Sequence, residues 1–202
     1  RITNPRAPEL RAQLQKNPAL LLKHTKDVDT TKLLLQLNAD PNTKNEDGRT
    51  PLIEVSIYGQ VDTARLLLQF NADPNTKTKY GSTPLHEASI YGKVDMARLL
   101  LQSKANLNTK NNYGDTPLHW ASTYGYVDMV RLLLQLKADP NTKNKYGETP
   151  LHEASIHGHM DTVRLLLQSK ANPNTKNNYG NTPFRVSSPE MKQLLEPIMQ
   201  IE

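Results

Sequence analysis

The feature that most constrains this chain is a sequence repeat with a period of 33 residues. The dipeptide Thr-Pro recurs at this spacing without a slip, beginning at Thr50, Thr83, Thr116, Thr149 and Thr182. The residues between the dipeptides also repeat, so that four full copies span residues 45–77, 78–110, 111–143 and 144–176. A fixed period of this length is typical of proteins in which each copy is one supersecondary unit packed against its neighbours. The period therefore predicts a stack of small units.

Each copy carries the signals of two helices. Thr83 is a helix N-cap, and Pro84 stands at the first helical position, where its missing N–H costs nothing. Gly92 ends this helix, and Val94 opens a second one. The apolar arc of the second helix consists of Val94, Ala97, Leu99, Leu100 and Leu101. Because this arc is wider than one stripe, the helix has to lie between neighbouring copies.

The phrase Thr-Pro-Leu-His-x-Ala resembles the signature of the ankyrin repeat. It occurs in full at Thr83 to Ala88, Thr116 to Ala121 and Thr149 to Ala154. The resemblance covers roughly residues 12–202. It implies an all-α repeat solenoid of stacked helix-turn-helix units with protruding β-hairpin loops. It also implies that the inner helices and the finger-like loops form a concave surface that binds other proteins.

The two ends depart from the repeat in the way that capping units do. We expect one ankyrin-repeat domain over residues 1–202. Residues 1–44 would form an extra helix, from about 8 to 16, and a capping repeat, and residues 177–202 would form the C-terminal capping repeat, with a last helix capped at Ser188. Altered terminal repeats keep the open ends of such a stack soluble.

Composition excludes several classes of protein. The chain has no cysteine, which excludes disulfides and thiol chemistry, and its longest apolar runs are far shorter than the ~20 residues that cross a bilayer. We expect a soluble monomer without membrane insertion, located in the cytoplasm or delivered into a host cytoplasm. Arg1 stands in place of an initiator Met and no signal peptide is visible, so we expect a processed or truncated chain. The Lys- and Asn-rich composition with its regular repeats is typical of genes from AT-rich genomes, such as those of many intracellular bacteria, and we expect the chain to be part of a bacterial effector.

One column departs from the ankyrin pattern. Where the family usually ends the second helix with Gly, this chain has Asn38, Asn71, Lys104, Lys137 and Lys170. If the backbone there is left-handed, each Lys costs on the order of 1 kcal/mol relative to Gly.

The repeated histidines and asparagines are predicted to be structural. His86, His119 and His152 occur once per repeat, and neighbouring repeats lie about 10 Å apart, which is too far for a shared metal ion. No acid is placed to complete a catalytic triad. We therefore expect no enzyme activity, no catalytic residues, no metal, no cofactor and no small-molecule substrate. The asparagines Asn75, Asn108, Asn141 and Asn174 are expected to organise local turns.

Two aromatic columns are candidates for partner binding. The first lies in the loop before each later Thr-Pro and comprises Tyr80, Tyr113, Tyr146 and Tyr179. The second lies before the helix-ending glycines and comprises Tyr58, Tyr91 and Tyr124, with His157 in the fourth place. The resemblance places both on the concave side, where tyrosine is a favoured binding anchor. The alternative is a ladder of tyrosines that stiffens the array.

Trp120 is the sharpest candidate. It is the only Trp, and it replaces a glutamate that recurs as Glu54, Glu87 and Glu153. An exposed aromatic in a central repeat resembles an interface hot spot, the alternative being a side chain that fills a gap beneath the tyrosines.

A further set of candidates lies in the loops, in the column just before each Thr cap, where the charge changes from repeat to repeat. This column comprises Arg49, Ser82, Asp115, Glu148 and Asn181, and its variable neighbours are Glu46, Lys79, Asn112 and Lys145. Because residues vary freely only where they do not hold the fold, these are candidates for specificity.

Protein binding and polyanion binding remain as alternatives. One lysine per loop, at Lys44, Lys77, Lys110, Lys143 and Lys176, could neutralise phosphates while tyrosines stack on bases. The 20 acidic residues against 25 basic ones argue for a solvated face instead. The favoured partner is another protein, of unknown identity, and nucleic acid is the second choice.

Overall fold

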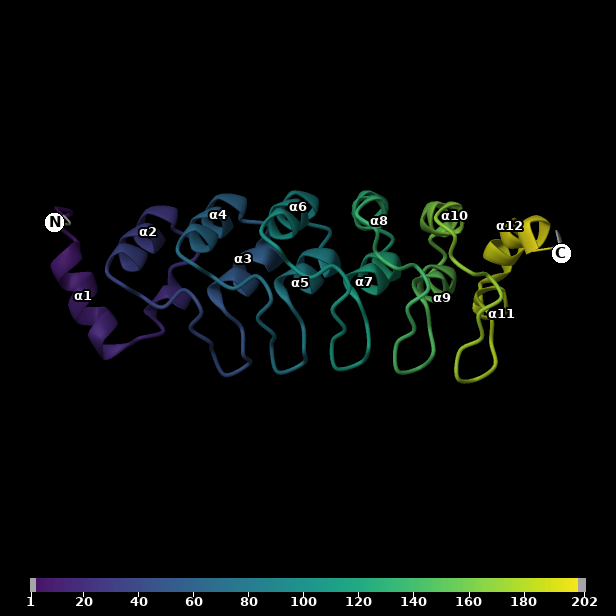
Figure 1. The fold of residues 1–202 in the computed structure, drawn as a ribbon, viewed down its shortest axis with the longest axis horizontal. Helices are drawn as coiled ribbons and strands as arrows, with labels where there is room; N and C mark the ends of the chain where they lie inside the picture. The colour runs from purple at the N-terminus through teal and green to yellow at the C-terminus, as the bar shows by residue number, and fades with distance from the viewer. Residues whose placement is uncertain (1–2, 200–202) are drawn as a thin grey trace. The chain divides into compact units, whose positions relative to one another are not determined.

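Paired helices joined by long loops make up the part of the chain that the computed structural model describes, residues 3–199 (Figure 1). The chain divides into two units, Arg1–Asn106 and Leu107–Glu202. No helix within the described residues is long and apolar enough to cross a membrane.

The first unit contains two rows of packed helices. Its elements are α1 (Ala7–Lys16), the short 3-10 helix η1 (Leu20–Lys23), α2 (Val28–Gln36), α3 (Pro51–Tyr58), α4 (Val61–Gln69), α5 (Pro84–Ile90) and α6 (Val94–Gln102). Helix α3 packs against α5, while α2, α4 and α6 form the second row. The predicted N-terminal helix is present as α1, which packs on α2 with Leu10 buried.

The second unit repeats this arrangement. Its elements are α7 (Pro117–Tyr124), α8 (Val127–Gln135), α9 (Pro150–Ile156), α10 (Met160–Gln168), α11 (Pro183–Val186) and α12 (Pro189–Met199). Helices α7, α9 and α11 pack in one row, and α8 packs against α10. The Ser188 hydroxyl accepts the N–H of Met191 at 3.2 Å, so the expected cap of the last helix is present. Residues 200–202 of the expected C-terminal cap lie outside the described residues.

The Thr-Pro signal acts as predicted at each first helix. The side chain of Thr149 accepts the N–H of His152 at 3.4 Å, and the Nδ1 atom of His152 accepts the N–H of Thr149 at 3.1 Å. This reciprocal pair is a capping box in which histidine takes the place of the usual Glu or Gln. The repeated histidine is therefore part of the helix start.

The second helices are buried on a different arc from the predicted one. In α6 the buried side chains are Met96, Ala97, Leu99 and Leu100, whereas Val94 and Leu101 are half-buried. The sequence reading placed Val94 and Leu101 in the stripe and omitted Met96. Met96 is fully buried because α6 packs on α4 as well as on its own partner helix α5.

The loops reverse direction without forming β-strands. In the first loop the Asn45 carbonyl accepts the N–H of Gly48 at 2.9 Å, and the N–H of Asn45 donates to the Arg49 carbonyl at 3.0 Å. Consecutive loops are joined by the N–H of Lys79 donating to the Asp47 carbonyl at 3.0 Å. These bonds are too sparse for a ladder, and residues 3–199 contain no strand. The all-α stack is confirmed, while the expected β-hairpins are reduced to turns.

The column that lacks glycine is left-handed, as predicted. Its φ angles are 65° at Asn38, 67° at Asn71, 70° at Lys104, 73° at Lys137 and 68° at Lys170. Lysine therefore occupies a backbone conformation that favours Gly or Asn.

Candidate functional site

The buried histidines join consecutive repeats. The Nδ1 atom of His119 lies 2.9 Å from the Thr116 hydroxyl, and its Nε2 atom lies 3.0 Å from the Glu148 carbonyl in the next repeat. Burial lowers the pKa of His119 and of His152 below the ordinary value, which favours a neutral ring. These contacts fit the structural role expected of the column. Within residues 3–199 no cluster of three or more His, Asp or Glu side chains could hold a metal ion.

The asparagine column bridges repeats instead of organising only its own turn. The Nδ2 atom of Asn141 donates to the Lys170 carbonyl at 3.1 Å, and its Oδ1 atom accepts the N–H of Asn172 at 2.7 Å. Asn75 makes the equivalent bonds to Lys104 and Asn106. The expectation of a local turn is corrected, because the partners lie about 30 residues away and belong to the following left-handed segment.

Three aromatic side chains of the second unit form a continuous surface, here called the aromatic strip: Trp120, Tyr124 and Tyr126. The centroids of Trp120 and Tyr124 are 6.2 Å apart, and those of Tyr124 and Tyr126 are 6.0 Å apart. Tyr124 and Tyr126 are 47% and 37% exposed. Sequence reasoning missed Tyr126, although it is the only tyrosine in a column otherwise occupied by Gln60, Lys93 and His159.

Trp120 differs from the expectation of an exposed side chain. The residue is half-buried, and its Nε1 atom is shielded from solvent without a hydrogen-bond partner in the described residues. The recurrent glutamates are covered to a similar or greater extent, Glu87 being buried and Glu54 and Glu153 half-buried, so the position itself lies partly inside the stack. A buried polar N–H that lacks a partner costs about 1–3 kcal/mol, so this position is not optimised for stability alone.

Three carboxyl groups of the second unit gather beside the strip. This carboxyl cluster consists of Asp115, Glu148 and Glu153. Burial raises the pKa of Glu153 to about 7, assisted by the negative charges of Glu148 and Asp115 and by a side-chain hydrogen bond with Glu148. The Oε2 atom of Glu153 also accepts the Thr123 hydroxyl at 3.3 Å. Because Thr123 lies three residues after Trp120 on the same face of α7, the cluster adjoins the aromatic strip.

Two members of the variable loop column contribute to the stack. The Asp115 carboxylate accepts from Asn144 Nδ2 at 2.9 Å, and the Glu148 carboxylate accepts from Asn177 Nδ2 at 3.5 Å. Both acids are half-buried. The expectation that this column does not hold the fold is therefore wrong for Asp115 and Glu148.

Two histidines of the fourth full repeat, His157 and His159, lie near the carboxyl cluster and the end of α7. His157 is exposed, and its Nε2 atom is 3.8 Å from the Glu153 carboxylate. Its ring stacks at 6.3 Å on that of His159, whose Nε2 atom lies 2.8 Å from the Thr123 carbonyl. His159 covers Gly125, where an added Cβ would come within 2.4 Å of the imidazole. The glycine thus allows the histidine to approach the end of α7.

The family follows from these repeated contacts together with a comparison to known families. The family model for ankyrin repeats (3 copies) matches residues 19–111, 72–144, 101–177 and 136–189. This chain belongs to the ankyrin repeat family. Ankyrin repeats are generally protein–protein interaction modules and typically non-catalytic. No curated protein matches the chain.

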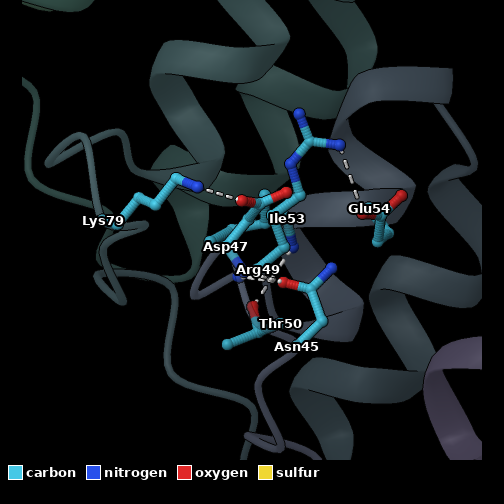
Figure 2. A network of polar contacts seen from close by, with 7 residues as sticks. All are labelled: Asn45, Asp47, Arg49, Thr50, Ile53, Glu54 and Lys79. Carbon is cyan, nitrogen blue, oxygen red and sulfur yellow. Dashed lines mark hydrogen bonds and ion pairs between the residues drawn. The ribbon is translucent and has the colours of Figure 1, made fainter.

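Two ion pairs involve loop residues of the first two full ankyrin repeats (Figure 2). Arg49 Nη1 lies 3.5 Å from the Glu54 carboxylate, and Lys79 pairs with Asp47. The Lys79 ammonium also lies over the ring of Tyr80, 5.1 Å from its centroid. The hydrogen bond from Lys79 lowers the pKa of Asp47.

The remaining candidate tyrosines are exposed but are not gathered into one site. Tyr58, with Lys26 at 5.5 Å from its ring, is 57% exposed, and Tyr91 is 47% exposed. Tyr113 and Tyr146 are both 48% exposed, and Lys145, between them in the ankyrin loops, is exposed as well. Among the described residues of the second unit, ring stacking joins no pair of Tyr113, Tyr146 and Tyr179. The loop tyrosines of this unit therefore do not form the stiffening ladder.

Proposed function

We propose that this ankyrin-repeat protein binds another protein, and that the aromatic strip of the second unit is the centre of the binding surface. The observation that carries the proposal is the stacking of Trp120, Tyr124 and Tyr126 with both tyrosines exposed. Tyr and Trp provide large, rigid contact areas and are enriched at binding hot spots.

The loops of the second unit extend this proposed surface, where Tyr113, Tyr146 and Lys145 would contact the partner. For the first unit, the proposed partner contacts are Arg49, Lys79, Tyr58, Tyr80 and Tyr91. His157 lies beside the carboxyl cluster and would contact the same partner as the strip. We propose that the chain acts as a monomer and as the recognition part of a larger assembly, such as a bacterial effector in a host cytoplasm.

The contacts of the loop lysines favour a protein partner over a polyanion. The ammonium groups of Lys44, Lys110 and Lys143 donate to the carbonyl oxygens of Lys77, Lys143 and Lys176 in the following repeat. These lysines thus link repeats, and this structural role accounts for their recurrence without a polyanion.

A pull-down experiment tests the proposed surface. Tagged wild-type protein and the double variant Trp120→Ala, Tyr124→Ala would be compared for capture of proteins from native lysate. We expect a partner that the wild type retains and the variant loses, because truncating hot-spot aromatics removes most of the binding free energy.

The matched control is Leu136→Ala. Leu136 is a large apolar side chain of the second unit, 47% exposed, and lies outside the aromatic strip and both tyrosine columns. Both variants should melt within a few degrees of the wild type. Equal capture by the wild type and the double variant would contradict the proposal.

A further inference from the structure

The loop position before the helix cap carries opposite charges in the first and fourth full repeats, while the glutamate five residues later is the same in both. In the first unit, Arg49 precedes the helix cap and its guanidinium pairs with Glu54, five residues later, at 3.5 Å. In the fourth full repeat, Glu148 takes the place of Arg49, and Glu153 takes the place of Glu54. A carboxylate therefore stands where the first unit supplies its own guanidinium (Figure 2).

This exchange leaves like charges facing each other. The charges that act on Glu153 are those of Glu148 and Asp115, and all three groups are acidic. Two carboxyl groups in contact cannot both ionise without repulsion, so the pair tends to hold a proton near neutral pH. A basic side chain of this unit, His157, lies beside Glu153, with its Nε2 atom 3.8 Å from the Glu153 carboxylate. A permanent cation placed here would displace the proton and relieve the repulsion.

The aromatic strip supplies the second half of the recognition chemistry. Trp120, on the same helix and one turn before Tyr124, occupies the glutamate column in the repeat next to Glu153. The negative faces of Trp and Tyr rings attract cations, and a guanidinium can also stack flat on them. An exposed apolar surface bordered by carboxylates is complementary in charge to a basic, partly apolar partner.

We propose that the aromatic strip and the carboxyl cluster together bind an arginine side chain of the partner protein, an inference that rests on the proposed function. The guanidinium would pair with Glu148 and Glu153 and stack against Tyr124. The partner's arginine thus provides the interaction that Arg49 provides within the first unit. Arginine is preferred to lysine because its planar fork can pair with carboxylates and stack on a ring at the same time.

The experiment uses single-residue probes on the intact chain. The ¹⁵N-labelled protein is titrated with N-acetyl-arginine amide at about pH 8 and constant ionic strength, where the acidic side chains are ionised. Trp120 is the only Trp, so its indole N–H gives one resolved NMR signal beside the site. We expect a saturable shift of this signal. The neutral analogue N-acetyl-citrulline amide should cause none, and N-acetyl-lysine amide should bind more weakly.

Variants of the cluster identify the groups involved. The double variant Glu148→Gln, Glu153→Gln should bind the arginine probe about 10-fold more weakly, since two partly exposed charge pairs are lost. The matched control Glu54→Gln, in the first unit, should leave the Trp120 response unchanged. Glu148→Arg should restore the arrangement of the first unit and block the probe with an internal guanidinium.

The outcomes separate this inference from the proposed function. The arginine assignment would be overturned by the absence of a shift, by an equal response to N-acetyl-citrulline amide, or by an equal affinity for N-acetyl-lysine amide. These measurements use the wild-type chain, so they do not depend on the folding of a variant. If the probe fails while Trp120→Ala, Tyr124→Ala still loses a partner, the surface binds protein by other chemistry. If that double variant keeps its partner, the proposed function fails whatever the probe shows.

Discussion

At the scale of single residues, the chain keeps lysine in a conformation that disfavours it. Lys104, Lys137 and Lys170 have φ angles of 70°, 73° and 68°. The Lys170 carbonyl accepts a hydrogen bond from Asn141 of the preceding repeat, so the left-handed segment is used to connect repeats. At position 170 this bond uses only the backbone carbonyl, so it does not require a lysine side chain there.

Replacing Lys137 with Gly should therefore stabilise the protein. We expect a gain of about 0.5–1 kcal/mol in the free energy of unfolding, because Gly relieves the left-handed strain and only part of that gain is offset by its larger unfolded-state entropy. Urea denaturation would measure it. The control Lys137→Ala removes the same side chain but keeps the Cβ, and it should not stabilise. An equal gain in both variants would show that the lysine side chain, not the backbone, carries the strain.

At the scale of elements, the packing of α9 beside α7 creates the carboxyl cluster. Helix α9 brings Glu153 under Thr123 of α7, and the loop before α9 brings Glu148 to the same point. Burial lowers the pKa of His119 and His152, so their contribution to folding stability depends on pH in the opposite sense to that of Glu153. Acidification below their ordinary pKa destabilises the folded chain through the histidines and stabilises it through the glutamate.

The substitution Glu153→Gln isolates the contribution of the glutamate. The folded pKa of Glu153 is about 7 and its ordinary value is 4.5, so the folded chain retains the proton between these values and loses stability as the pH rises through that window. We expect the variant to exceed the wild type by about 1 kcal/mol at about pH 8, discounted for partial solvent contact. The difference should shrink towards about pH 5.

Denaturant titrations of both proteins at the two pH values provide the measurement. The histidine contribution is common to both and cancels in the difference. A gain that is the same at both pH values would indicate altered packing and would exclude a raised pKa at Glu153.

At the scale of the whole molecule, the two units raise the question of cooperativity. A single domain over residues 1–202, with repeats at 45–77, 78–110, 111–143 and 144–176, stays a prediction. Stacked repeats unfold together when the coupling between neighbours is strong relative to the stability of each repeat. Trp120 lies in the second unit, so its fluorescence reports on that unit separately from the helical signal of the whole chain.

A substitution that creates a cavity in the first unit tests the prediction of a single domain. Leu67 is fully buried in α4, and Leu67→Ala should destabilise by about 2–5 kcal/mol. If the chain is one domain, the Trp120 fluorescence transition should move to lower denaturant together with the circular dichroism transition. Gln69→Ala, at an exposed position of the same helix, serves as the control and should move neither. A fluorescence transition that stays in place would show that the units unfold independently.

The sequence by itself determined the repeated elements, because their signals are local. Thr-Pro caps, glycine stops, the last cap at Ser188 and the left-handed column each depend on a few neighbouring residues, and the structure confirms them. Trp120 could also be selected from the sequence because it breaks the column of glutamates. Tyr124 could be selected because it belongs to the column of tyrosines before the helix-ending glycines.

Only the tertiary structure decided which side chains of different repeats meet. The sequence did not show that Glu153 lies against Glu148 and Thr123, that Asn141 reaches Lys170, or that Tyr126 extends the aromatic strip. These contacts depend on how one repeat is positioned on the next, which no short segment encodes. The burial of the Trp120 indole and the raised pKa of Glu153 follow from that stacking, and so does the proposed site for an arginine side chain.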